Sequence, residues 1–388
     1  MPTPAATRVP ALESATYIME GDPDDACLST YHLIMAGTHA CNLRCRHCYL
    51  PDHDSEVLAE ATALSLVDQW SRIVENECGE KNGIFHVKGG EPLVIPYFRG
   101  LIQRVLEVGN LHLMLTTNGT LGTPEFFDLL TAYNQAACGE ITVIVSLDGA
   151  TAGSHELLRG RHQYQKTIDF IAALVHRDIR TFLNCVLHTD NIHEAEDYLA
   201  LAVRLGVKQV NFLPLVPKGF GQSLRLHQVS QAELHQRLDA IYQTAGDDVR
   251  DLMVGSLPHI LNRARAGVAP AHECTAGYRG LFYITPEGDT FTCPNITRPE
   301  FSLGNVYRES LLDMMGRLNA LRYEIKPRPG QHGDRYLCTG ERLLYETTGD
   351  GRNLANLVQL QSRCDEQLNA TKSSAPAGSR AYCVSRNF

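Results

Sequence analysis

The chain has 388 residues, of which 44% are hydrophobic and 20% are charged, and its formal net charge is −9 at pH 7. This length favours one large domain with a smaller one, and the composition is typical of a globular protein with a sizeable core. The negative charge argues against binding to nucleic acid or to anionic membranes, and no apolar stretch approaches the length of a membrane span. Because the first residues also lack a signal-peptide pattern, we expect a cytoplasmic protein.

Short β-prone runs alternate with amphipathic segments between about residue 31 and residue 220. The expected strands are 31–36, 84–88, 111–116, 140–147, 181–187 and 209–215, and the expected helices are 58–77, 97–107, 124–137, 165–177 and 193–205. Strands that alternate with helices predict a parallel sheet with crossover connections. Periodicity by itself leaves open whether this sheet is an open, doubly wound one or a barrel.

Three cysteines follow the first expected strand closely. Cys41, Cys45 and Cys48 have the spacing C-x3-C-x2-C. Three thiolates on one short loop can hold three irons of a cubane iron–sulfur cluster and leave the fourth iron open to a substrate or cofactor. The alternative is a structural zinc site, which would normally have four protein ligands. No neatly spaced fourth ligand follows, although His47 lies inside the loop.

Further motifs fall at the carboxyl ends of the next expected strands, which is where parallel barrels place their chemistry. The second strand runs into Gly89-Gly90-Glu91-Pro92, the third ends in Thr116-Thr117-Asn118-Gly119, and the fourth ends in Ser146-Leu147-Asp148-Gly149. Each motif alone is more often a turn. Glycines nevertheless let a ligand approach the backbone closely, and the carboxylate of Glu91 can receive an ammonium group.

The cysteine loop followed by these motifs in this order resembles the radical S-adenosylmethionine (SAM) superfamily, over roughly residues 31–220. In that family an aromatic residue precedes the last cysteine, and His47 is acceptable there. The resemblance implies an α/β fold with a partial (β/α)6 barrel. It also implies a [4Fe–4S] cluster on Cys41, Cys45 and Cys48, with SAM on the open iron. Reductive cleavage of SAM then gives a 5′-deoxyadenosyl radical that takes hydrogen from a substrate C–H bond.

The resemblance further implies a set of residues that contact SAM or the substrate. These are Gly89, Gly90, Glu91, Pro92, Asn118, Ser146, Asp148, Arg159, Asn184, Phe212 and Leu213. The Gly-Gly-Glu-Pro element receives the SAM amino group, and Ser146 and Asp148 lie near the ribose or the substrate. Arg159 pairs with the SAM carboxylate, since a guanidinium can bind a carboxylate with two hydrogen bonds. Its alternative is a surface arginine at a helix end.

The two last strands of the expected barrel complete this set. The resemblance implies that Asn184 on the fifth strand reaches SAM, and that the segment 211–214 on the sixth, with Phe212 and Leu213, packs on the adenine. A role in the core or in a turn is the alternative for both positions. No catalytic base can be chosen from the sixteen histidines and forty-four acidic residues.

A second region begins near residue 271. There Pro286-Glu287-Gly288-Asp289 predicts a hairpin turn between two short strands. Cys274, followed by Gly288-x4-Cys293, resembles the opening of the SPASM/twitch extension, whose cysteines bind an auxiliary iron–sulfur cluster. The dense cysteine run of a full SPASM domain is absent from the sequence. We therefore expect one auxiliary cluster, held by Cys274, Cys293, Cys338 and either Cys364 or Cys383. Core cysteines or a zinc knuckle are the alternative.

The expected organisation has five parts along the chain. They are an N-terminal segment (1–30), the barrel (31–220), a helical linker (221–270), a small α+β auxiliary-cluster domain (271–368) and a flexible tail (369–388). About 30 residues precede the first strand, which is short for a fused peptide-recognition domain.

Three functions are weighed against one another. The leading hypothesis is modification of a ribosomally synthesised peptide by a crosslink, a thioether or epimerisation. It requires a reductant such as flavodoxin or ferredoxin, and either a separate recognition protein or direct capture of the peptide. The rival is oxidation or rearrangement of a small polar metabolite such as an aminocyclitol or sugar. A non-catalytic electron-transfer protein is the third, and the Gly-Gly-Glu-Pro element argues against it because electron transfer needs no SAM amine site.

Overall fold

The computed structural model describes residues 31–50, 52–53, 56–78, 83–136, 141–253, 281–294, 297 and 299–325. The strands are β1 (His32–Ala36), β2 (Gly83–Lys88), β3 (Leu111–Thr117), β4 (Ile141–Ser146), β5 (Arg180–Leu187), β6 (Gln209–Pro214), β7 (Leu281–Ile284), β8 (Asp289–Phe291) and β9 (Gly304–Asn305). The α-helices are α3 (Glu60–Cys78), α4 (Phe98–Val108), α5 (Pro124–Gln135), α6 (Ala152–Arg159), α7 (Tyr164–Val175), α8 (Ala195–Leu205), α9 (Gln231–Thr244), α10 (Asp247–Leu252) and α12 (Leu311–Ile325). Within these residues, one sheet has the strand order β6-β5-β4-β3-β2-β1-β7-β8-β9.

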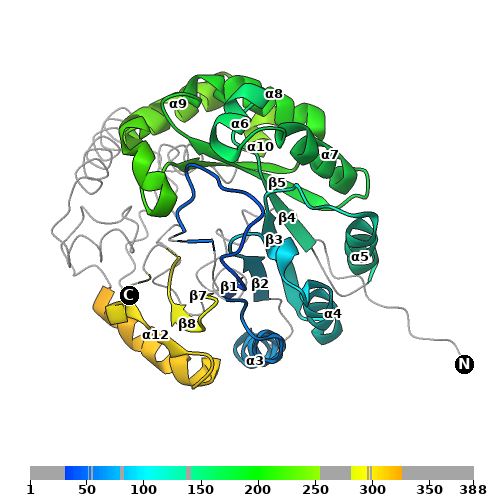
Figure 1. Ribbon diagram of the computed structural model, residues 1–388, viewed down its shortest axis with the longest axis vertical. Helices are drawn as coiled ribbons and strands as arrows, with labels where there is room; N and C mark the ends of the chain where they lie inside the picture. The colour runs from blue at the N-terminus through cyan, green and yellow to red at the C-terminus, as the bar shows by residue number, and fades with distance from the viewer. Residues whose placement is uncertain are drawn as a thin grey trace, which may run out of the picture.

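Strands β1 to β6 form the barrel that the sequence predicts. Each pairs in parallel with its neighbour along the chain, so every connection is a crossover. The sheet curves, and helices α3, α4, α5, α7 and α8 cover its outer face (Figure 1). Every expected strand and helix of the barrel is present with small shifts at its ends. The expected partial (β/α)6 barrel is therefore confirmed, and α6 is a further short helix that periodicity did not predict.

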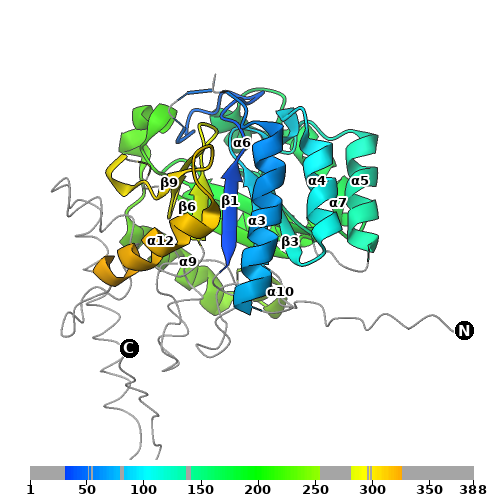
Figure 2. The same ribbon diagram turned by 90° about the horizontal axis from the view of Figure 1, so that it is seen from below.

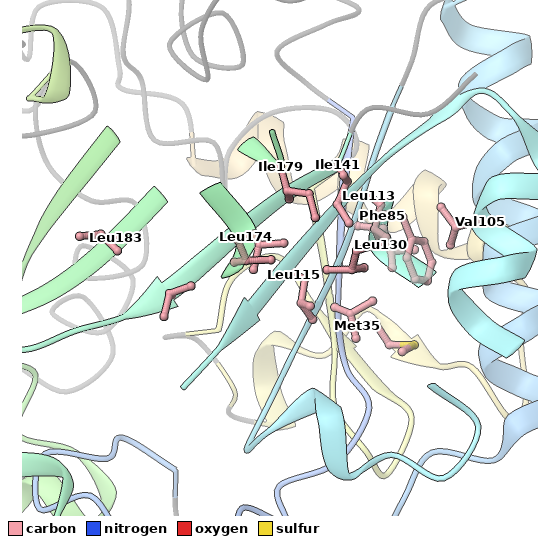
Figure 3. Close-up of a cluster of buried hydrophobic side chains, with 14 of the residues drawn as sticks. Met35, Phe85, Val105, Leu113, Leu115, Leu130, Ile141, Leu174, Ile179 and Leu183 are labelled. Carbon is pink, nitrogen blue, oxygen red and sulfur yellow. The ribbon is translucent and has the colours of Figure 1, made fainter. Parts of the chain in front are cut away.

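The main core lies between the sheet and these helices. Alternate strand residues point outward and pack on apolar helix residues, which hides both partners from water. Figure 3 shows Leu113 and Leu115 from β3 beside Val105 of α4 and Leu130 of α5. A smaller cluster of buried residues fills the inner face of the sheet, and its members are Ile84, Met114, Ile144 and Phe182.

The expected hairpin is confirmed and continues the barrel sheet. Strands β7 and β8 are antiparallel, and Gly288 in their turn has a φ of +85°, a conformation that glycine adopts without strain. Strand β7 pairs in parallel with β1, on the edge opposite β2. The described residues after 281 thus join the barrel directly, and the backbone N–H of Leu311 at the start of α12 bonds to Gln69 of α3.

The described part of the helical linker contains α9, α10 and a 3-10 segment, η3 (Gly219–His227). Its remainder, together with residues 1–30 and 369–388, lies outside the described residues. Among the described helices, none combines the length and the apolar character that a membrane crossing requires.

Candidate functional site

The three motif cysteines lie on the loop between β1 and α3, at the end of the barrel toward which β1 points (Figure 2). All three thiols are free and partly exposed. Burial raises their pKa values, that of Cys45 to about 11, and the neighbouring Cys41 and Cys48 add to this rise. Three thiolates on one loop repel one another and are stabilised by a cationic centre that they share. The loop therefore fits an iron–sulfur cluster.

The glycines of the Gly-Gly-Glu-Pro element let β2 end directly beneath this loop. A Cβ on Gly90 would lie 2.2 Å from the carbonyl oxygen of Ala40 and 2.3 Å from that of His39. The backbone N–H groups of Gly90 and Glu91 instead donate to the carbonyl oxygens of Thr38 and Ala40, over 2.8 and 2.9 Å. A side chain at residue 90 would push the cysteine loop away.

Glu91 is fully buried and holds the end of β3. Its Oε1 accepts hydrogen bonds from the Thr117 hydroxyl at 2.7 Å and from the Leu93 N–H at 3.2 Å, while Oε2 accepts from the Asn118 N–H at 2.8 Å. Burial raises the pKa of Glu91, and these three donors oppose the rise. Pro92 begins the 3-10 turn η1 (Pro92–Val94), which Glu91 caps.

Asn118 connects the end of β3 to the first cysteine. Its Nδ2 donates to Asn42 Oδ1 over 2.8 Å and lies 3.8 Å from Cys41 Sγ. The third-strand signature is therefore placed against the cysteine loop, where the sequence analysis expects a cofactor contact.

Asp148 and Arg159 form a buried ion pair beside Cys45. Arg159 Nε donates to Asp148 Oδ2 over 2.5 Å, and His47 Nε2 lies 3.2 Å from the same oxygen. Burial alone would raise the pKa of Asp148, but Arg159 and His47 outweigh it and hold that pKa well below its usual range. Arg159 Nη1 also lies 4.0 Å from Cys45 Sγ. The arginine is only 10% exposed, so it is not a surface residue at a helix end.

The inner face of β4, β5 and β6 carries a row of polar side chains. Ser146 pairs in register with Asn184, and Asn184 with Asn211, whose Nδ2 donates to Asn184 Oδ1 over 2.9 Å. Leu213 lies on this face and is 38% exposed. Phe212 points the opposite way, into the core between sheet and helices, where its ring packs on Tyr198. Its position matches the core role that the sequence analysis gave as the alternative.

Lys88 is a feature that the sequence analysis missed. It ends β2 on the inner face, and its Nζ lies 5.8 Å from the ring centre of Tyr49 and 5.9 Å from that of Tyr283. Among the described residues, the ammonium group has no carboxylate partner. The alternation of inward and outward residues along β2 could have indicated that Lys88 points inward. Its contact with Tyr283 could not be predicted in this way, because Tyr283 belongs to β7, almost two hundred residues later.

Cys293 is the one expected auxiliary ligand that falls within the described residues. It is buried just after β8 and packs with Ile34, Tyr283 and Phe291. Cys274, Cys338, Cys364 and Cys383 lie outside the described residues.

The described residues combine a parallel partial barrel with a three-cysteine loop at the carboxyl end of its first strand. Consistent with this, the family model "Radical SAM superfamily" matches residues 35–202, which include all three cysteines, Glu91 and the Asp148–Arg159 pair. Residues 35–202 are therefore a radical SAM domain, and the chain spans 58% of the length of the first curated relative described below.

The curated proteins to which the chain is similar carry names that describe different processes. The antilisterial bacteriocin subtilosin biosynthesis protein AlbA of Bacillus subtilis is 28% identical over 282 residues, which are 72% of this chain and 58% of AlbA. The AdoMet-dependent heme synthase of Methanosarcina barkeri is 26% identical over 81% of this chain and 91% of its own length. The PqqA peptide cyclase of Methylorubrum populi is 26% identical over 70% of this chain and 67% of the cyclase.

Solved structures share the fold at low sequence identity. The enzyme anSMEcpe with bound AdoMet has a TM-score of 0.60 at 14% identity, covering 86% of this chain and 99% of the other. Streptococcus suis SuiB bound to its precursor peptide SuiA has a TM-score of 0.55 at 17% identity, covering 76% of this chain and 66% of SuiB. Both likenesses concern the fold alone.

Proposed function

We propose that this enzyme modifies a C–H bond of a ribosomally synthesised peptide. The observation that carries the radical SAM part is the loop of three half-buried cysteines, braced by Gly90 below and by Arg159 beside it. The peptide part is supported by two relatives, whose names describe bacteriocin biosynthesis and a peptide cyclase. This chain spans only 58% of the length of AlbA. The reaction itself is therefore part of the proposal, as well as the substrate.

Cys41, Cys45 and Cys48 would hold the [4Fe–4S] cluster. When bound, the cluster and SAM supply a carbon radical that takes hydrogen from an unactivated C–H bond. The protein's own part is electrostatic and positional. Arg159 places a positive charge 4.0 Å from Cys45 Sγ, which offsets the negative charge of the thiolates. Asp148 fixes that guanidinium from its other side.

The inner face of the barrel would position the substrate. Lys88, Ser146, Asn184 and Asn211 are all half-buried and point to the same side of the sheet. Amide, hydroxyl and ammonium groups can bond to the N–H and C=O groups of a peptide backbone and to its polar side chains. Enclosure by the sheet would exclude water from the reacting atoms.

A small-molecule substrate is the second candidate. The heme synthase alignment favours it, because that relative is matched over 91% of its length whereas AlbA is matched over 58%. The polar groups that would receive a peptide could equally receive a polar metabolite.

The deciding experiment follows hydrogen from substrate to product. The anaerobically reconstituted enzyme is incubated with SAM, a reductant and synthetic deuterated peptides encoded next to its gene. We expect deuterium in the 5′-deoxyadenosine and a changed peptide mass, both lost in the C41A/C45A/C48A variant. 5′-Deoxyadenosine without deuterium from any peptide, together with deuterium from a labelled metabolite extract, would favour the second candidate. No 5′-deoxyadenosine at all would contradict both.

We further propose one auxiliary cluster on Cys274, Cys293, Cys338 and Cys364. The same triple variant tests it, because its motif cluster is removed. About four irons per chain should remain after reconstitution if a second [4Fe–4S] centre exists. Iron near zero in a folded triple variant would mean that these cysteines are structural or reactive thiols. Reductants such as flavodoxin or ferredoxin, and a separate peptide-recognition protein, are proposed partners of this reaction.

A further inference from the structure

Two segments that are distant in sequence meet beyond the carboxyl end of β5. One is the loop 188–191 that follows β5, and the other is the end of η3. The backbone N–H of Thr189 donates to the carbonyl oxygen of His227 over 3.0 Å. This bond brings the side chains of His188, Asp190 and His227 together.

These three side chains direct potential metal ligands at one another. Asp190 Oδ2 lies 2.9 Å from His227 Nδ1 and 3.7 Å from His188 Nδ1, and one ligand atom from each residue lies within 4.8 Å of the others. Zinc–ligand bonds of about 2.0–2.2 Å in a tetrahedron place ligand atoms roughly 3.3–3.6 Å apart. The two distances from Asp190 lie on either side of this spacing, and the two histidine ligand atoms lie within 4.8 Å of each other.

The buried ring of His188 makes few hydrogen bonds, which is a second observation at this cluster. Its side chain is only 2% exposed, yet Nε2 has no hydrogen-bond partner, and Nδ1 receives just one long bond, from the Asp190 N–H at 3.3 Å. A buried imidazole normally has stronger partners. Its Nδ1 faces the Asp190 carboxylate, and a metal ion at Nδ1 would replace only this one long hydrogen bond.

The loop that carries His188 is also held rigidly. The His188 N–H donates to Asn191 Oδ1 over 2.8 Å, and Asn191 Nδ2 donates to the carbonyl oxygens of Val186 and Asp148 over 2.9 and 3.1 Å. Rigid support of this kind lowers the cost of ordering the ligands when an ion binds.

We propose that His188, Asp190 and His227 bind one divalent transition-metal ion such as Zn²⁺, separate from the iron–sulfur chemistry. Two imidazole nitrogens and one carboxylate oxygen form a ligand set that zinc accepts, and the partial exposure of Asp190 and His227 leaves room for a water ligand.

The ion would crosslink the loop after β5 to η3, and η3 in turn contacts the cysteine loop. Segment η3 ends at His227, and near its start the Gly221 N–H donates to the carbonyl oxygen of Cys48 over 2.9 Å. Fixing His227 to the loop after β5 therefore also fixes the segment that covers the last cysteine. The simpler interpretation is an exposed ion pair between Asp190 and His227, which would contribute little to stability.

The experiment uses the reconstituted full-length enzyme, with its iron–sulfur sites loaded, and zinc sulfate as the probe. After incubation with zinc and desalting, zinc, iron and sulfide are measured in the wild type, D190N and H227Q. Both substituted residues are partly exposed, and unchanged iron content and circular dichroism would show that the variants fold. His193→Gln serves as the matched control, since His193 is an exposed histidine of the same region with no ligand role.

We expect about one zinc per chain in the wild type and in H193Q, and roughly tenfold or greater weakening of zinc binding in D190N and H227Q. X-ray absorption at the zinc edge should show nitrogen and oxygen neighbours without sulfur. Zinc retained equally by all four proteins, no zinc in the wild type, or a sulfur-containing shell would each overturn the proposal. The result does not depend on the substrate, so it stands or falls separately from the proposed function.

Discussion

Arg159, in the last turn of α6, and Asp148, just beyond β4, form a buried ion pair over 2.5 Å. The Asp148 carboxylate is fully buried, and its Oδ1 also accepts from the Val186 N–H of β5 over 2.9 Å. The pair therefore joins β4, β5 and α6. Through its contact with Cys45, Arg159 extends this network to the cysteine loop.

Arg159→Met should destabilise the protein strongly. Removing one partner of a buried ion pair leaves an uncompensated charge and costs about 3–5 kcal/mol. Urea denaturation at pH 7 measures the free energy of unfolding. Arg161→Met is the matched control, because Arg161 is exposed two residues away and should change stability by about 0.5 kcal/mol or less. Equal stability of the two variants would contradict a structural role for the pair.

Stability should fall as the pH drops below neutrality, partly because of His155. Burial lowers its pKa to about 4, and its Nδ1 accepts from the Asp148 N–H at 3.1 Å. Between pH 6.5 and pH 4 the unfolded chain therefore binds a proton that the folded protein does not, which favours unfolding. This residue alone should lower the free energy of unfolding by about 2 kcal/mol from pH 7 to pH 5.

The variant His155→Asn isolates this contribution, since an amide oxygen can replace Nδ1 as the acceptor. Its unfolding free energy should depend less steeply on pH than that of the wild type, whereas the exposed His193→Asn should match the wild type. An unchanged pH slope in His155→Asn would show that His155 is not the group that titrates.

Gly90→Ala should disrupt the cysteine loop. The new Cβ would lie 2.2 Å from the Ala40 carbonyl oxygen, a clash with backbone that cannot move without displacing the loop. We expect iron and sulfide content, measured after reconstitution, to fall by half or more. Gly100→Ala is the matched control, because that helical glycine meets nothing closer than 3.8 Å and alanine should stabilise α4 by about 1 kcal/mol. Full iron content in Gly90→Ala would refute this reading of the glycine.

Lys88→Met should impair use of the substrate while sparing SAM cleavage. The half-buried ammonium lies between Tyr49 and Tyr283 on the inner face, with no carboxylate partner among the described residues. Once a substrate is identified, its KM should rise roughly tenfold, the effect of losing about 1.4 kcal/mol of binding. Substrate-free 5′-deoxyadenosine formation should stay near the wild-type rate. Lys208→Met, at an exposed position, controls for loss of charge. Equal KM values for the two variants would contradict the prediction.

The sequence predicted the strands and helices of the barrel well because their signals are local. Alternating strands and helices appear as changes of periodicity, and the cysteine loop and the turn motifs lie within a few residues of the strands they follow. The order of those motifs was enough to indicate the radical SAM fold, and Pro286-Glu287-Gly288-Asp289 was enough to predict the hairpin.

Long-range pairing decided the rest. Asn211 and Phe212 must face opposite sides of β6, but only packing against Tyr198 determines that Phe212 is the one that faces the helices. Glu91 and Arg159 could be chosen as charged candidates from sequence, yet their partners Thr117, Asn118 and Asp148 come from other elements. The pairing of β7 with β1, and the meeting of His188 with His227, likewise join segments that no local pattern relates. Spacing along the chain determined which cofactor chemistry this protein's loops can support, and the pairing of distant strands and loops decided which side chains surround them.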